Sequence, residues 1–223
     1  MLAKLVRASI DPNGVDDAAR AVTEELVPAF VAHPGSRQGY WMADRSSGRV
    51  LVLTAWADES SLLSEQATDG RERARAAERV GLRIHAIQTL LVVAAHEAAD
   101  RASTVTRWVR ATCVEGVSPD LGDLLAELHA QAVSDQSLSA GFRASYWLTD
   151  PDTTDGLALS MWSAPAYLSD GEPDSRRRRR HFERRLGCRI TNVATYEAIG
   201  VAARPDIDLS GQGMTRSPAT VTA

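Results

Sequence analysis

Residues 35–44 read GSRQGYWMAD, and residues 141–150 read GFRASYWLTD. The two stretches share a glycine, an arginine, an adjacent Tyr-Trp pair and a final aspartate at a constant offset of 106 residues. The whole chain of 223 residues holds only 5 tryptophans and 4 tyrosines, so this coincidence is hard to obtain by chance. Because a segment repeated at a constant offset marks a repeated structural unit, the sequence predicts a duplicated fold.

The same offset continues towards the end of each copy. Thr54-Ala55-Trp56 returns as Ser160-Met161-Trp162, and residues 81–84 return as residues 187–190. The repeat therefore holds over roughly 50 residues and includes the turns as well as the apolar runs.

Near the start of each copy the offset is different. Residues 6–9 resemble residues 109–112 at an offset of 103, which predicts three extra residues early in the second copy. The polar, alanine-rich stretch between the copies reads as a linker, and the Ser/Gly/Pro/Thr-rich end reads as a tail. We expect a first repeat over 1–97, a linker over 98–103, a second repeat over 104–203 and a flexible tail over 204–223.

Charge excludes two classes of partner. The chain has 25 Lys+Arg and 29 Asp+Glu, a formal net charge of −4. Proteins dedicated to nucleic acid or to anionic membranes carry a basic excess instead, so we expect neither as a partner. No apolar run approaches the length of a membrane span and the N-terminus has no signal pattern, which predicts a soluble cytoplasmic protein.

The two cysteines do not form a metal-binding pattern. Cys113 and Cys188 stand far apart, and neither belongs to a CxxC or Cys/His ligand spacing. We expect no metal site, and we expect both thiols to be reduced neighbours on the helix-facing side of the second copy.

Both copies show the same alternation of strand and helix patterns. Runs rich in β-branched residues alternate with runs at helical spacing, and Gly, Pro and Asp mark the turns. The order is β-α-β-β-α-β twice, which gives a four-stranded antiparallel sheet with both helices on one face and the other face still to be covered. The expected strands are 2–10, 39–43, 50–56, 82–94, 106–114, 145–149, 157–162 and 188–199, and the expected helices are 15–32, 59–80, 121–133 and 164–186.

Alternation along each strand separates the residues of its two faces. In the third strand of the second copy, Leu157, Leu159 and Met161 are the more apolar set, and we assign them to the helices. That leaves Ser160 and Trp162 to face the other sheet. The same reasoning predicts two similar pockets, each with a tryptophan, one or two arginines and small hydroxyls, a form typical of small-molecule sites.

Residues 33–40 and 51–59, with their counterparts 140–146 and 157–164, resemble the antibiotic-biosynthesis-monooxygenase-like domain of the dimeric α+β barrel superfamily. The resemblance covers nearly all of the first 200 residues. In that family two sheets from two subunits pack face to face. The implied fold class is therefore α+β, with two ferredoxin-like repeats that form an intramolecular barrel: a monomeric pseudo-dimer open to further homo-oligomerisation.

The resemblance also implies an activity: oxygenation of a small aromatic or phenolic molecule by O₂, without metal, haem or flavin. In such chemistry the substrate's phenolate supplies the electron, Arg189 stabilises the oxyanion and Trp162 packs on the substrate. Tyr167 completes the catalytic candidates and favours the second copy, because the first copy has serine at the matching position. The expected ligand-binding residues are Trp56, Arg83, Arg7, Arg110, Ser160 and Trp108.

Two other function classes fit the same sequence. A non-catalytic ligand-binding or structural barrel would use the tryptophans as core aromatics and the arginines in ion pairs. A binder of an anionic partner would use the seven arginines between Arg176 and Arg185, which otherwise form a solvated helix face balanced by nearby acids. An open cavity favours the enzyme, a filled core favours the structural barrel, and a continuous basic face favours the anion binder.

Overall fold

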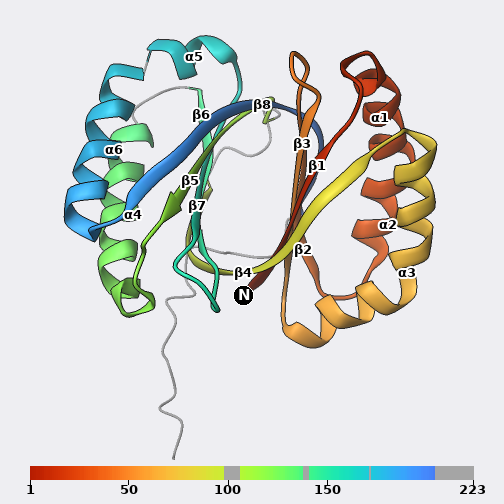
Figure 1. The fold of residues 1–223 in the computed structure, drawn as a ribbon, viewed down its shortest axis with the longest axis horizontal. Coiled ribbons are helices and arrows are strands. Elements are labelled where there is room, and N and C mark those ends of the chain that lie inside the picture. Colours follow the sequence, from red (N-terminus) through yellow and green to blue (C-terminus); the bar gives the residue numbers. More distant parts are fainter. Residues whose placement is uncertain (98–105, 138–140, 171, 204–223) are drawn as a thin grey trace, which may run out of the picture.

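In the computed structural model, eight strands form one closed antiparallel barrel, and helices cover its outside on two opposite sides (Figure 1). The structure describes residues 1–97, 106–137, 141–170 and 172–203, so the expected linker at 98–103 and tail at 204–223 lie outside the described residues. The strands are β1 (Leu2–Ser9), β2 (Ser36–Asp44), β3 (Arg49–Trp56), β4 (Arg83–Glu97), β5 (Trp108–Glu115), β6 (Phe142–Thr149), β7 (Gly156–Trp162) and β8 (Arg189–Ala203).

The helices of the two halves differ in their regularity. The first half has α1 (Val15–Ala21), a π-helical turn (Val22–Leu26), α2 (Val27–Ala32) and α3 (Glu59–Arg79); the second has α4 (Gly122–Ser137), α5 (Pro165–Asp170) and α6 (Glu172–Leu186). Pro28 at the start of α2 has no N–H to continue the α-helical hydrogen bonds, and the wider π turn directly precedes it. In the described part of the chain, no helix is long and apolar enough to cross a membrane.

The predicted order β-α-β-β-α-β occurs in both halves, and the fold class of two ferredoxin-like units in one α+β barrel is confirmed. The barrel closes because β4 and β8 are long strands of 15 residues. Each begins on a strand of its own half, β4 on β1 and β8 on β5, and ends on a strand of the other half, β4 on β6 and β8 on β2.

Strand register corrects the predicted shift near the start of each copy. Leu2 lies opposite Trp56, and Trp108 lies opposite Trp162, so the offset of 106 already holds in the first strands. The expected offset of 103 there is wrong, because it differs by an odd number of residues and would exchange the two faces of the strand. Lys4, not Arg7, is therefore the counterpart of Arg110.

The two faces of the strands are also the reverse of our assignment. Leu157, Leu159 and Met161 point into the barrel, where they join the main core with residues of the other half. Ser160 and Trp162 point outward to the helices. An eight-stranded barrel leaves an interior that side chains just fill, so the larger apolar set occupies it.

A tyrosine pair joins the two halves inside the barrel. The hydroxyls of Tyr40 and Tyr146, which are 106 residues apart, lie 3.1 Å from one another. Tyr146 also donates to the carboxylate of Glu97, and burial raises the pKa of Tyr146 well above its usual value. The repeated aromatic residues thus meet at the contact between the halves.

The two cysteines lie on opposite faces of the sheet. Cys113 packs against the barrel core, whereas Cys188 is buried among the residues that α4 and α6 cover. Both thiols are free, and the expected position of Cys113 beside Cys188 on the helix side is wrong. The same face reversal that moves Trp162 outward moves Cys113 inward.

Candidate functional site

In the first half, a buried ion pair lies between the outer face of the sheet and α3. Lys4 Nζ donates to both carboxylate oxygens of Glu65, at 3.1 and 2.8 Å. The two residues are only 8% and 4% exposed. Burying two charged groups costs a large desolvation free energy, so a buried ion pair in this position is unusual.

Neighbouring strands and a helix cap position this group of residues. Lys4 pairs directly with Thr54 across β1 and β3, so both side chains stand on the outer face. Thr54 Oγ1 in turn accepts a hydrogen bond of 3.1 Å from Trp56 Nε1. Glu65 lies in the second turn of α3, which begins where Asp58 accepts a hydrogen bond from the backbone N–H of Ser61.

These residues form the polar end of a cavity of about 530 Å³. Its walls are apolar, and the helices contribute mostly small residues, which leaves the space between helix and sheet unfilled. Ile199 of β8 also lines it, so the second half completes the cavity of the first. The apolar walls include Val6, Ala18, Ala21, Val22, Leu26, Ala29, Phe30, Trp41, Val50, Val52, Ala76, Ala77, Val80, Leu82, Ile84 and Ile87.

Aromatic contacts hold the tryptophan at this polar end. The ring of Trp56 is fully buried and meets Phe30 at 5.2 Å and His33 at 5.1 Å, both edge to face. His33 Nδ1 lies 2.7 Å from the carbonyl oxygen of Pro34, which orients the imidazole. Trp56 is therefore a rigid wall of the cavity.

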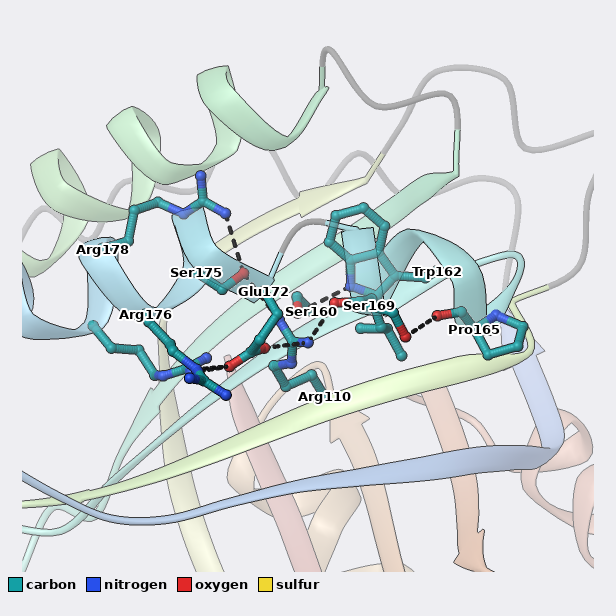
Figure 2. Close-up of polar contacts among 11 residues, drawn as sticks. Arg110, Ser160, Trp162, Pro165, Ser169, Glu172, Ser175, Arg176 and Arg178 are labelled. Carbon is teal, nitrogen blue, oxygen red and sulfur yellow. Dashed lines mark hydrogen bonds and ion pairs between the residues drawn. The ribbon is translucent and has the colours of Figure 1, made fainter.

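The second half carries an equivalent group, but it is packed shut. Figure 2 shows Arg110 of the sheet beside Glu172, the first residue of α6. Arg110 Nη2 lies 2.7 Å from Glu172 Oε2. Arg110 also donates to Ser175 Oγ at 2.9 Å and to the carbonyl oxygen of Leu168 at 2.8 Å. Trp162 Nε1 donates to Ser160 Oγ at 3.1 Å, as Trp56 does to Thr54.

Burial and neighbouring charges act on this ion pair in opposite directions. Burial lowers the pKa of Arg110. Burial alone would raise the pKa of Glu172, but hydrogen bonds from Arg179 and Arg176 and the charge of Arg110 lower it below its usual range. The carboxylate of Glu172 thus pairs with three arginines, Arg110, Arg176 and Arg179.

Only about 70 Å³ remain open beside the second ion pair. Trp162 packs with Phe142 and Leu168, and Tyr167 and Trp108 lie against the same cluster. The ring of Tyr167 lies over Gly141, where a Cβ would come within 1.9 Å of it. Tyr167 therefore fills space beside Trp162 in a way that its counterpart Ser61 cannot.

The structure does not bring Arg189 to Trp162. The side chain of Arg189 is 74% exposed and pairs with Glu115 at 2.6 Å, at one end of the barrel. Arg83 is likewise exposed, and Arg7 lines a different cavity. Of the expected ligand-binding residues, only Trp56 lines the large cavity, while Arg110 and Ser160 line the small one.

Sequence reasoning missed Lys4 and Glu65. A signal was present, because Lys4 is the only lysine in a chain with 24 arginines and stands in a predicted strand. A lysine inside a strand that is buried on both faces needs an acidic partner, and Glu65 follows in the next predicted helix.

The arginine run is mostly neutralised within its own neighbourhood. Arg176 and Arg179 pair with Glu172, and Arg177 pairs with Asp174. Arg178 lies 3.8 Å from Asp135 of α4. In the ranges that the structure describes, no group of three or more His, Cys, Asp or Glu residues could hold a metal ion.

The fold is similar to that of several solved structures, whereas no family model and no curated protein matches the sequence. A candidate monooxygenase from Fusobacterium nucleatum superposes with a TM-score of 0.66 at 10% identity, over 91% of this chain and 94% of that one. An anthrone oxidase-like protein gives 0.60 at 13% identity, over 97% and 96%. A ferredoxin-fold protein related to antibiotic biosynthesis monooxygenases, from Listeria monocytogenes, gives 0.51 at 8% identity, over 88% and 94%. The chain therefore has the fold of the antibiotic-biosynthesis-monooxygenase-like proteins, closed as a single α+β barrel.

Proposed function

We propose that this protein binds a small, largely apolar molecule in the 530 Å³ cavity of its first half. The observation that carries the proposal is the Lys4–Glu65 pair, which is buried in the lining of a cavity whose other walls are mostly apolar. Replacing a buried ion pair by apolar residues is often neutral or stabilising, so its presence beside open space suggests a ligand.

The chemistry of the lining indicates the class of ligand. The ammonium group of Lys4 donates hydrogen bonds and the carboxylate of Glu65 accepts them, so the pair suits a hydroxyl or a neighbouring carbonyl. Trp56 offers a flat apolar surface beside it. A planar aromatic molecule with one phenolic or enolic oxygen satisfies both requirements.

We further propose that the bound molecule is oxygenated by O₂ without a cofactor. Glu65 takes the proton of the phenol or enol, and Lys4 stabilises the resulting oxyanion. The electron-rich anion then reduces O₂. For anthrone, the CH₂ group loses two hydrogens and gains one oxygen atom, and the second oxygen atom leaves as water. The likeness to an anthrone oxidase-like protein makes anthrone the first substrate to test.

This proposal moves the reacting residues from the second half to the first. Lys4 takes the oxyanion-stabilising role expected of Arg189, and Trp56 takes the packing role expected of Trp162. Glu65 takes the place of Tyr167 among the catalytic candidates and adds a base, a role for which the sequence suggested no residue. The large cavity of the first half supports the change, as does the small volume of about 70 Å³ left beside Arg110 in the second.

Oxygen uptake with anthrone tests the reaction, and tryptophan fluorescence titration under nitrogen tests binding. We expect Glu65→Gln to retain binding and to lower kcat by about a hundredfold, the usual contribution of a general base. Trp56→Phe should weaken binding, whereas the matched change Trp162→Phe should leave it as in the wild type. Equal losses from both tryptophan variants would overturn the choice of the first half.

The same experiment separates the enzyme from a binding protein. Saturable binding of anthrone without any oxygen uptake would overturn the oxygenation and leave the ligand-binding barrel. Absence of saturable binding by a panel of planar phenols would overturn both.

A further inference from the structure

A further cavity, separate from those beside Lys4 and Arg110, opens at one end of the barrel and holds about 250 Å³. Strands of both halves form it, β1 and β4 from the first and β5, β7 and β8 from the second. Three leucines that belong to or border the main core, Leu5, Leu90 and Leu157, give it an apolar floor. The remaining lining residues are Arg7, Gln88, Cys113, Val114, Glu115, Asp155, Gly156, Thr191 and Asn192.

Arg7 is the cation of this cavity, and its partners are neutral. Its Nε donates to Gln88 Oε1 at 3.3 Å, and both terminal nitrogens lie 3.7 Å from Cys113 Sγ. Over the described residues, Arg7 forms no ion pair with a carboxylate. A guanidinium that is half-buried among neutral groups loses hydration without gaining an anion in return.

The geometry of these donors suits a carboxylate. Guanidinium binds carboxylate through two parallel hydrogen bonds, and the two terminal nitrogens of Arg7 face the cavity wall together at Cys113. The sulfur is a weak acceptor that an anion can replace. The amide groups of Gln88 and Asn192 add neutral donors to the lining.

The other charged groups of the cavity limit the charge of its ligand. Glu115 and Asp155 both contribute to the lining, and Glu115 is already paired with Arg189 at 2.6 Å. Two carboxylates beside one arginine disfavour a dianion such as phosphate. The leucine floor favours an apolar body over a purely polar one.

We propose that this barrel-end cavity binds a small monocarboxylate, with its carboxylate on Arg7 and its apolar body on the leucine floor. The site is independent of the proposed oxygenation, because it lies on the opposite face of the sheet from Lys4 and uses none of the same residues. A cavity of 250 Å³ admits an aromatic acid of the size of benzoate.

Calorimetric titration of the full chain with benzoate, acetate and phosphate tests the proposal. We expect saturable binding of benzoate, weaker binding of acetate and none of phosphate. Arg7→Met should weaken benzoate binding about tenfold or more, since it removes a charge-assisted bidentate contact. Arg83→Met is the matched control, because this arginine is exposed and outside the lining of the cavity.

Alkylation of Cys113 locates the bound acid. Cys113 lines the cavity and Cys188 is buried elsewhere, so benzoate should slow the reaction of iodoacetamide with Cys113 in the wild type and not in Arg7→Met. If Arg7→Met fails to fold, Arg7→Gln gives the same comparison. Wild type without saturable benzoate binding, equal binding by both arginine variants, unprotected Cys113, or phosphate binding as tight as benzoate would each overturn the proposal.

Discussion

At the scale of single residues, Lys4 and Glu65 form the buried ion pair of the first half, and the stability of the fold depends on their staying paired. Lys4→Met removes the cation that lies against the buried Glu65 carboxylate, which should destabilise the fold by about 3 kcal/mol or more. Lys4→Met combined with Glu65→Leu should recover most of that loss, because two apolar residues need no counter-charge. Urea unfolding of the wild type, the single variant and the double variant measures both the loss of stability and its recovery. A double variant as unstable as the single one would show that the pair stabilises the fold directly.

His129 is another buried titratable residue, and it should make stability depend on pH. Its Nε2 lies 3.2 Å from Ser145 Oγ, and burial lowers its pKa from 6.5 to about 4. Because the folded-state pKa lies below the unfolded one, the neutral form is the stable one. The stability is complete above pH 6.5 and is lost as pH falls towards 4, by about 3 kcal/mol in total.

Urea unfolding at pH 7, 5.5 and 4 measures this effect. The variant His129→Gln keeps a polar group for Ser145 but does not titrate, so its stability should change less across this range than that of the wild type. Subtracting the stability profile of the variant from that of the wild type removes the contribution of the carboxylates, which both proteins share. Parallel profiles of unfolding free energy against pH would show that His129 is not the source of the pH dependence.

At the scale of secondary-structure elements, the π-helical turn is a feature that distinguishes the first half from the second. It supplies Val22 and Leu26 to the cavity wall, whereas α4, its counterpart, is a regular helix with only about 70 Å³ open between it and the sheet. The turn rests on β8 at Gly200, where a Cβ would come within 2.3 Å of Val22 Cγ1. Glycine is therefore needed for the close approach of helix and strand.

We expect Gly200→Ala to force this turn away from the sheet. The clash should cost about 1–3 kcal/mol and should also alter ligand binding in the first-half cavity. Gly122→Ala at the start of α4 is the control, because nothing lies within 4 Å of its Cβ position and alanine favours a helix. Thermal unfolding and the anthrone titration follow both variants. Equal stability and equal affinity of the two variants would show that the contact of this turn with Gly200 does not shape the cavity.

At the scale of the whole molecule, closure of the barrel depends on both halves. The last residues of β4 pair with β6 and those of β8 pair with β2, so neither half has a complete set of strand partners alone. The apolar interior, including Leu51 and Leu157, is also shared. An isolated half would expose both unpaired strand edges and this core.

A fragment of residues 1–103 should therefore associate rather than remain monomeric. The free edge of β2 can accept β4 of a second copy, as it accepts β8 in the intact chain, which would rebuild a barrel from two subunits. Sedimentation velocity of the fragment and of the full chain measures this difference. A stable, folded monomeric fragment would show that cross-pairing is dispensable.

The sequence by itself determined the element order and the duplication pattern, because apolar periodicity and repeated aromatics are local properties of the chain. The barrel class came from the resemblance of the repeated motifs to a known family. The sequence also grouped Ser160 with Trp162 and Leu157 with Met161 correctly. It could not decide which group faces the interior, since alternation separates the two faces without saying which one is inside.

Only the tertiary structure decided that direction, and the site followed from it. Closing the barrel turned Trp162 outward, brought Lys4 to Glu65 across 61 residues, and left Arg189 at the exposed barrel end. Whether a pocket is open or filled depends on how helices and side chains from distant segments pack together, as Tyr167 on Gly141 shows. That packing is a property of the assembled core, so neither spacing nor composition could supply it.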